Sequence, residues 1–177
     1  MSLSARDAAQ WWRDMRPDPD RRRPGDRGGL ARLRHCATVG EAMREPATHD
    51  LFRRVGGTGH WDLTPAALAA AVLAHIRDDD RENRHIARRI GPDDPGKPET
   101  ALLKPLRFRR LMEATSEDER LTAFRRLAAL AGGKLNVENL AEALLHWTED
   151  RQRRWVYDYW NADVRPPTTH RAEETTP

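Results

Sequence analysis

The sequence lacks paired cysteines, long apolar runs and, almost entirely, lysine. Its single cysteine, Cys36, excludes an intrachain disulfide, and we interpret it as a packed structural thiol. No apolar stretch approaches the ~20 residues that span a bilayer. The N-terminal segment MSLSARDAAQWW has no signal-peptide core. We therefore expect a soluble cytoplasmic protein that makes no membrane contact.

Motifs for catalysis and for metal binding are also missing. The seven histidines are scattered, without an H-x-x-x-H or H-E-x-x-H pair, and one cysteine cannot build a zinc finger. The sequence contains neither a G-x-x-x-x-G-K-[ST] phosphate loop nor a G-x-S-x-G elbow. We predict no catalytic residue, no metal and no cofactor, so the protein is not expected to be an enzyme.

Two weaker patterns leave alternatives open. His49–Asp50 is similar to the dyad of metal-dependent phosphohydrolases, although the other ligands of such a site have no counterpart. We favour His49 as a surface residue near a helix start. The run Asp78–Asp79–Asp80 offers oxygen ligands for a hard cation, but we interpret it as a solvated helix end.

Charge is abundant and nearly balanced. Charged residues make up 33% of the chain, and 31 basic residues against 28 acidic ones leave a net charge of +3. Arginine supplies all but three of the basic residues, the lysines being Lys97, Lys104 and Lys134. Residues 1–54 hold 12 basic and 8 acidic groups (+4), and residues 101–161 hold 11 and 9 (+2), whereas residues 55–100 hold 6 and 8 (−2). Two basic blocks around an acidic middle favour a polyanionic partner.

Apolar residues recur at helical spacing along almost the whole chain, and strand-like alternation is nearly absent. We predict an all-α fold: a compact helical bundle, with two packed helical halves as a variant. The polar segment 91–98 is the candidate boundary between an N-terminal half (1–92) and a C-terminal half (98–161). Residues 162–177 are almost entirely polar, so we predict a disordered tail there.

Capping residues predict where helices begin. Thr38 with Glu41 and Ser116 with Glu119 have capping-box spacing. Further helix starts are expected at Asp26, Pro46, Thr64–Pro65, Pro105 and Asn136. The apolar stripe changes phase after Trp147, which predicts a helix break near Thr148. The predicted buried stripes include Leu30, Leu33 and Ala37 in one helix, and Trp155, Val156, Tyr159 and Trp160 in the last.

Arginines recur in pairs beside these apolar stripes, as Arg109–Arg110, Arg125–Arg126 and Arg153–Arg154. Arg107 and Arg110, three residues apart, should project together from one flank of a helix. Guanidinium groups bind phosphate oxygens bidentately, so such a ridge matches a nucleic-acid strand. Ordinary surface ion pairs with nearby glutamates and aspartates are the alternative. A codon bias toward arginine also remains an explanation of why arginine so outnumbers lysine.

Six motifs occur in an order that resembles the small-subunit (CasB) family of type I-E CRISPR Cascade complexes, over roughly residues 8–160. They are WWRDM, RGGLARLRHC, LFRRV, LRFRRLM, FRRLAALAGGKLNVENLAEALLHW and RRWVYDYW. The resemblance implies an all-helical, non-catalytic subunit of an RNA-guided antiviral complex. It further implies two copies packed head to tail against the backbone and large subunits. Basic patches would then hold the DNA and stabilise the R-loop.

The resemblance implies three kinds of partner: other Cascade subunits, a second copy of the chain, and nucleic acid, as the guide RNA–target DNA heteroduplex and the displaced DNA strand. The nucleic-acid-binding positions that it implies are Arg27, Arg32, Arg34, Arg107, Arg109, Arg110, Arg125, Arg126, Lys134, Arg153 and Arg154. The alternative function is a structural helical adaptor whose arginines serve protein contacts only. We assign no function to the loop 16–26 or to the tail.

Overall fold

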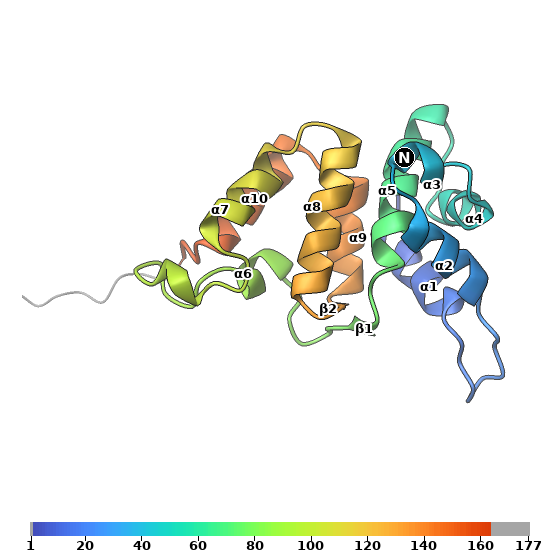
Figure 1. Ribbon diagram of the computed structural model, residues 1–177, viewed down its shortest axis with the longest axis horizontal. Helices are drawn as coiled ribbons and strands as arrows, with labels where there is room; N and C mark the ends of the chain where they lie inside the picture. The colour runs from blue at the N-terminus through green and yellow to red at the C-terminus, as the bar shows by residue number, and fades with distance from the viewer. Residues whose placement is uncertain (1, 164–177) are drawn as a thin grey trace, which may run out of the picture.

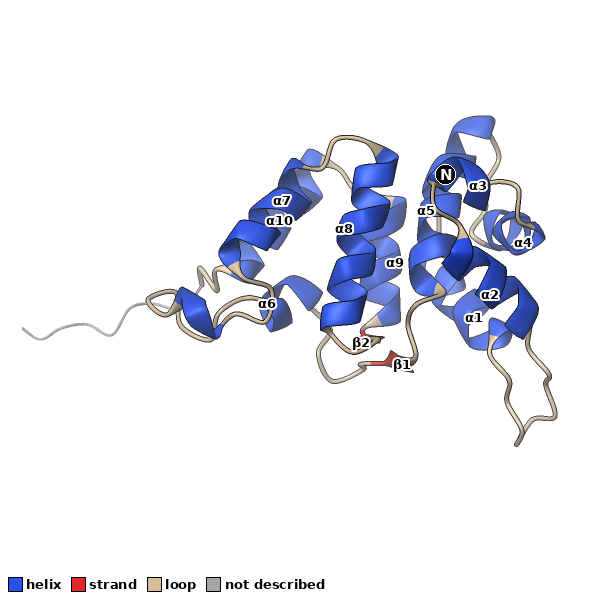
Figure 2. Cartoon of the chain, viewed as in Figure 1, coloured by secondary structure: helices blue, strands red, loops and turns tan. Residues whose placement is uncertain are grey.

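The computed structural model describes residues 2–163, where helices joined by loops make up the regular structure apart from two short strands (Figure 2). The helices are α1 (Ala5–Met15), α2 (Arg27–His35), α3 (Val39–Ala42), α4 (Pro46–Arg54), α5 (Leu63–Leu73), α6 (Ile86–Ile90), α7 (Pro105–Glu113), α8 (Glu117–Leu130), α9 (Val137–Leu145) and α10 (Glu149–Tyr159). There are also two 3-10 turns, η1 (His60–Asp62) and η2 (Pro98–Thr100). Two short strands, β1 (Asp78–Asp79) and β2 (Lys134–Leu135), pair in parallel. The predicted all-α fold is confirmed.

Helix α5 lies at the centre of the molecule, with α1–α4 on one side and α8 and α9 on the other (Figure 1). Every residue from 66 to 73 is at most 2% exposed. A helix that is apolar around its whole circumference has to be enclosed by other elements. Five of these eight residues are alanines, whose small side chains let neighbouring helices approach closely.

The end of the molecule opposite α1–α4 is formed by α7 and α10, with α6 beneath them in the view of Figure 1. The ring of Phe108 on α7 stacks on Tyr159 of α10 with their centroids 3.8 Å apart. The Tyr159 hydroxyl donates to the Leu103 carbonyl at 2.6 Å. Helix α6 precedes the 91–98 segment but packs against α10, which follows it. One hydrophobic core includes residues from both sides of that segment, and the division into halves stays a prediction.

Side-chain caps form at several of the predicted helix starts. The hydroxyl of Thr38 accepts from the Glu41 amide at 3.1 Å, and Ser116 and Glu119 form a complete capping box. Asn136 caps α9. The predicted break is also confirmed: α9 ends at Leu145, and the Thr148 hydroxyl caps α10. These caps satisfy amide groups that a helix start leaves without partners.

Three details of the helices differ from the sequence prediction. Helix α5 begins at Leu63, before Thr64, because the turn η1 continues directly into it. Ala37 is exposed and Cys36 is buried in its place, since α2 ends at His35 and the chain then becomes extended. Val156 is 41% exposed, so the buried stripe of α10 is formed by Trp155 and Tyr159.

The run of three aspartates is not the solvated helix end that we predicted. Asp78 and Asp79 form β1, which pairs with β2. The Asp80 side chain is buried, 3.3 Å from the Arg89 guanidinium, and accepts hydrogen bonds from Asn83. A two-residue strand has no periodicity of its own, and its partner lies far along the chain, so the sequence carried no local signal for it.

Arg125 fastens α8 to α2 and α5. Its guanidinium donates to the carbonyl oxygens of Cys36 at 2.6 Å, Leu33 at 2.9 Å and Ala71 at 3.4 Å. These carbonyls lie at the C-terminal ends of α2 and α5, which carry partial negative charge. The Leu33 carbonyl also accepts from the Cys36 amide at 3.3 Å. One side chain thus joins three helices from its position on α8.

No helix in residues 2–163 has the length and apolar character required to cross a membrane.

Ala70→Leu in α5 is expected to lower the free energy of unfolding by about 1–3 kcal/mol, because the enclosed helix has no room for a larger side chain. Urea denaturation measures the effect. The control is Ala31→Leu on the exposed face of α2, which should leave stability within about 0.5 kcal/mol. Equal stability of both variants would contradict the central role of α5.

Arg125→Met is expected to lower the free energy of unfolding by about 1–3 kcal/mol, because it leaves the carbonyls of Cys36 and Ala71 without a donor. The adjacent variant, Arg126→Met, removes the same charge from an exposed position and should cost less than about 0.5 kcal/mol. Thermal and urea denaturation of the two proteins provides the comparison. A similar loss in both would rule out the carbonyl contacts as the cause.

Candidate nucleic-acid interface

A groove between α7 and α8 brings together three of the predicted arginines. Arg107 and Arg110 reach it from α7, and Arg126 reaches it from α8. The remaining lining is apolar: Leu103, Leu111, Ala123, Ala129 and Leu130. All three arginines are exposed, and among residues 2–163 none has a carboxylate within 4 Å. Their guanidinium groups therefore have donors available for an external anion.

One end of this groove is acidic. Arg110 and Arg126 also line an adjoining hollow that contains Glu113, Asp118 and Glu119. Asp118 accepts from the Val39 amide at 2.8 Å, and Glu119 accepts from the amides of Thr115 and Ser116. These backbone hydrogen bonds lower the pKa of the Glu119 carboxyl. A polyanion is thus repelled at this end and attracted at the Arg107 end.

Arg125 points away from this groove, into the contact of α8 with α2 and α5, and burial lowers the pKa of its guanidinium. Beside it, burial together with the charges of Arg125 and Arg34 lowers the pKa of His75 to about 4. His75 is therefore neutral at pH 7 and adds no positive charge. The guanidinium of Arg125 is engaged within the protein, so we leave it out of the phosphate-binding set.

The three predicted arginines of α2 do not line the α7–α8 groove. Arg27, Arg32 and Arg34 are exposed, and Arg32 lies 3.0 Å from the Glu45 carboxylate. Arg27 and Arg34 have no carboxylate within 4 Å in the part of the chain that the structure describes. Two turns of one helix separate them, so they lie on the same face of α2.

The other predicted positions lie apart from one another. Lys134 is exposed in β2, and its carbonyl accepts from Arg89. Arg153 lies 3.9 Å from Glu149 and from Asp150, and Arg154 lies 3.1 Å from Asp150. Both side chains are more than 70% exposed, where ion pairs are weak and readily exchanged. Arg109 is exposed on α7. Their contact with nucleic acid stays a prediction.

Several exposed apolar side chains were missed as candidates for partner contacts. Trp61 is 68% exposed on η1, Leu106 is 58% exposed on α7, and Tyr157 is 51% exposed on α10. Aromatic and apolar anchors of this kind are typical of the buried centres of protein interfaces. Leu106 and Tyr157 lie off the buried stripes of their helices, which was the signal available in the sequence.

The side chains of His49 and Asp50 have separate partners. His49 is exposed near the start of α4, as we favoured, and its Nε2 lies 2.8 Å from the Met43 carbonyl oxygen. Asp50 pairs instead with Arg54 at 3.1 Å. Within residues 2–163, no three His, Cys, Asp or Glu side chains are grouped so that they could hold a metal ion.

Comparisons with known proteins give a family and a fold. Residues 29–160 match the family of the CRISPR-associated protein Cse2. A chain of the crystal structure of E. coli Cascade bound to a PAM-containing dsDNA target is similar, with a TM-score of 0.59 and 18% identity, over 90% of this chain and 95% of that chain. No curated protein sequence matches. Because the family match spans well over half of the chain, the protein belongs to the Cse2 (CasB) family, as its ordered motifs indicated.

Proposed function

We propose that the protein is the small subunit of a type I-E Cascade complex, without catalytic activity of its own, and that it works in the cytoplasm in antiviral defence. It holds the phosphate backbone of DNA and so stabilises the R-loop. The observation that carries this proposal is the convergence of Arg107, Arg110 and Arg126, without carboxylate partners in residues 2–163, on one groove. Membership of the Cse2 family supports it.

Energetics favour such a stabilising role. Exchange of a DNA duplex for an RNA–DNA heteroduplex is nearly balanced, so a few backbone contacts can shift the equilibrium. Contacts to phosphates position the strand without reading its sequence. A subunit with a few unpaired arginines is therefore sufficient, because guide pairing supplies the specificity.

The proposed partners are the backbone and large subunits of Cascade, a second copy of the chain, the guide RNA–target DNA heteroduplex and the displaced strand. The exposed side chains of Trp61 and Tyr157 fit contacts with protein subunits. The E. coli chain with the same fold comes from a complex that holds dsDNA, which supports the assignment of DNA as a partner.

The adaptor function remains the second candidate, and one observation favours it. Leucines line the same groove: Leu103, Leu111 and Leu130, of which Leu130 is 36% exposed. An apolar lining with basic residues suits an acidic segment of a protein partner. The two candidates differ in what the loss of the arginines should damage, namely DNA retention or assembly.

Arg107→Gln, Arg110→Gln and Arg126→Gln together are expected to weaken target-DNA binding by the complex while leaving its assembly intact. Up to three phosphate contacts would be lost, so the slope of log affinity against log salt should fall by up to about 2.7. The measurements are uptake of the subunit by size-exclusion chromatography, duplex binding at several salt concentrations, and permanganate reactivity of the displaced strand.

The matched control replaces Arg6, Arg44 and Arg53 with glutamine, which removes the same charge from exposed positions outside the groove. A complex without the subunit gives the lower limit of DNA binding. If the groove variant fails to enter the complex, the adaptor function is favoured. Normal assembly with unchanged DNA binding would remove this groove from the proposal.

A further inference from the structure

The polar loop between α1 and α2 is an ordered hairpin rather than an irregular connection. Asp18 and Arg23 pair as an antiparallel bridge through two backbone hydrogen bonds of 2.9 Å. Gly25 has φ +63°, and a Cβ there would lie 2.6 Å from the Met15 carbonyl oxygen, so only glycine fits. The hairpin precedes residue 29, where the match to the Cse2 family begins. It therefore lies outside the residues that the family match covers.

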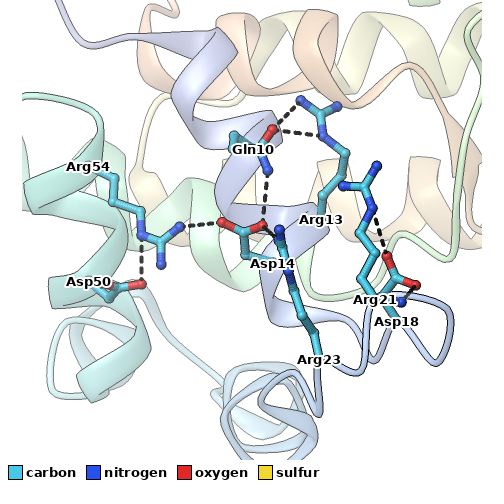
Figure 3. Close-up of polar contacts among 8 residues, drawn as sticks. All are labelled: Gln10, Arg13, Asp14, Asp18, Arg21, Arg23, Asp50 and Arg54. Atoms are coloured by element: carbon cyan, nitrogen blue, oxygen red, sulfur yellow. Dashed lines mark hydrogen bonds and ion pairs between the residues drawn. The ribbon is translucent and has the colours of Figure 1, made fainter.

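Asp14 anchors this hairpin to the helices beside it (Figure 3). Its carboxylate accepts from Arg23 of the hairpin at 2.8 Å, from Arg54 of α4 at 2.7 Å and from Gln10 at 2.9 Å. Burial alone would raise the pKa of Asp14, but these hydrogen bonds and the charges of Arg54 and Arg23 lower it. Arg54 is also paired with Asp50 at 3.1 Å, so Asp14 mainly serves to tie the hairpin to α1 and α4.

The hairpin and α1 enclose a hollow with an excess of positive charge. Its lining has five arginines, Arg13, Arg16, Arg21, Arg23 and Arg81, and two carboxylates, Asp14 and Asp18, which leaves three positive charges (5 − 2). Asp79 lies just beyond this lining, 3.3 Å from Arg81 and 4.0 Å from Arg13. Even with Asp79 included, the arginines outnumber the carboxylates.

Two of these arginines lack a strong ion pair within the described residues. The Arg16 guanidinium lies 4.8 Å from the centre of the Trp12 ring, and no carboxylate of residues 2–163 lies within 4 Å of it. Trp12 is itself fixed, because its indole donates to the Ile76 carbonyl at 3.1 Å. Arg21 is 70% exposed, and its only ion pair in the described chain is Asp18 at 3.7 Å. Both guanidinium groups can therefore receive an oxyanion.

We propose that this hollow binds the sugar–phosphate backbone of nucleic acid, as a second contact apart from the α7–α8 groove. The exposed large apolar side chains of residues 2–163 lie elsewhere, on η1, α8, α10 and in and before α7. A protein partner would need such anchors here, whereas a phosphodiester strand needs only positive charge and donors. The inference takes DNA as the partner from the proposed function, but it rests on different residues.

The test replaces Arg16 and Arg21 with glutamine in the full chain and retains Arg23, which anchors the hairpin. Each variant is assembled into the complex, and binding of a fluorescent target duplex is measured by anisotropy over a series of salt concentrations. The affinity is expected to fall, and the slope of log affinity against log salt to decrease by about 1.8, for two lost phosphate contacts. The control, Arg6→Gln with Arg44→Gln, has the same net charge and should retain the slope of the unmodified chain.

The outcomes separate the two proposals. A complex with the hairpin variant that binds DNA like the complex with the control variant would overturn the hairpin site. Weakened binding in this variant, with normal binding in the Arg107, Arg110 and Arg126 variant, would retain the hairpin site and reject the groove. Displacement of the duplex by inorganic phosphate, beyond that by chloride at equal ionic strength, would indicate a site for small phosphates and overturn strand binding.

Discussion

The enclosure of α5 is the constraint on which the rest of the structure depends. A helix that is at most 2% exposed from residue 66 to residue 73 needs neighbours on every side. Helices α3 and α4 cover one side and α8 and α9 another. Because its alanines set how closely these helices approach, α5 also fixes the position of α8. The groove that carries Arg126 on the opposite side of α8 is therefore held by a packed core.

Two adjacent residues on α8 show how one side-chain type serves two purposes. Successive residues of a helix point about 100° apart, so Arg125 turns toward α2 and α5 while Arg126 turns toward α7. Arg125 donates to carbonyls at two helix ends, so its guanidinium is engaged within the protein. Arg126 lies on the same rigid helix and remains open to an external anion. The contacts of Arg125 with α2 and α5 thus fix the orientation of α8, and with it the direction in which Arg126 points.

The sequence predicted the helices well because their signals are local. A cap such as Ser116 with Glu119, or the phase change at Thr148, lies within a few residues of its effect. The pairing of β1 with β2, and the hydrogen bond from the Asn136 side chain to the Asp80 carbonyl, join residues more than fifty positions apart. For the arginines a local signal existed but was not used: Arg125 follows buried Leu121 by four residues, whereas Arg126 follows exposed Thr122.

The small net charge of +3 has a consequence for how DNA would be held. Acidic and basic groups nearly cancel over the whole chain, and salt screens charges beyond about 8–10 Å, so long-range attraction is weak. Binding must then come from short-range contacts at arginines that lack a strong partner, such as Arg107 and Arg16. Such contacts become effective when other subunits already hold the DNA nearby, because the local concentration of phosphate is then high. A nearly neutral subunit with a few open guanidinium groups therefore suits a role inside a complex better than independent capture of DNA.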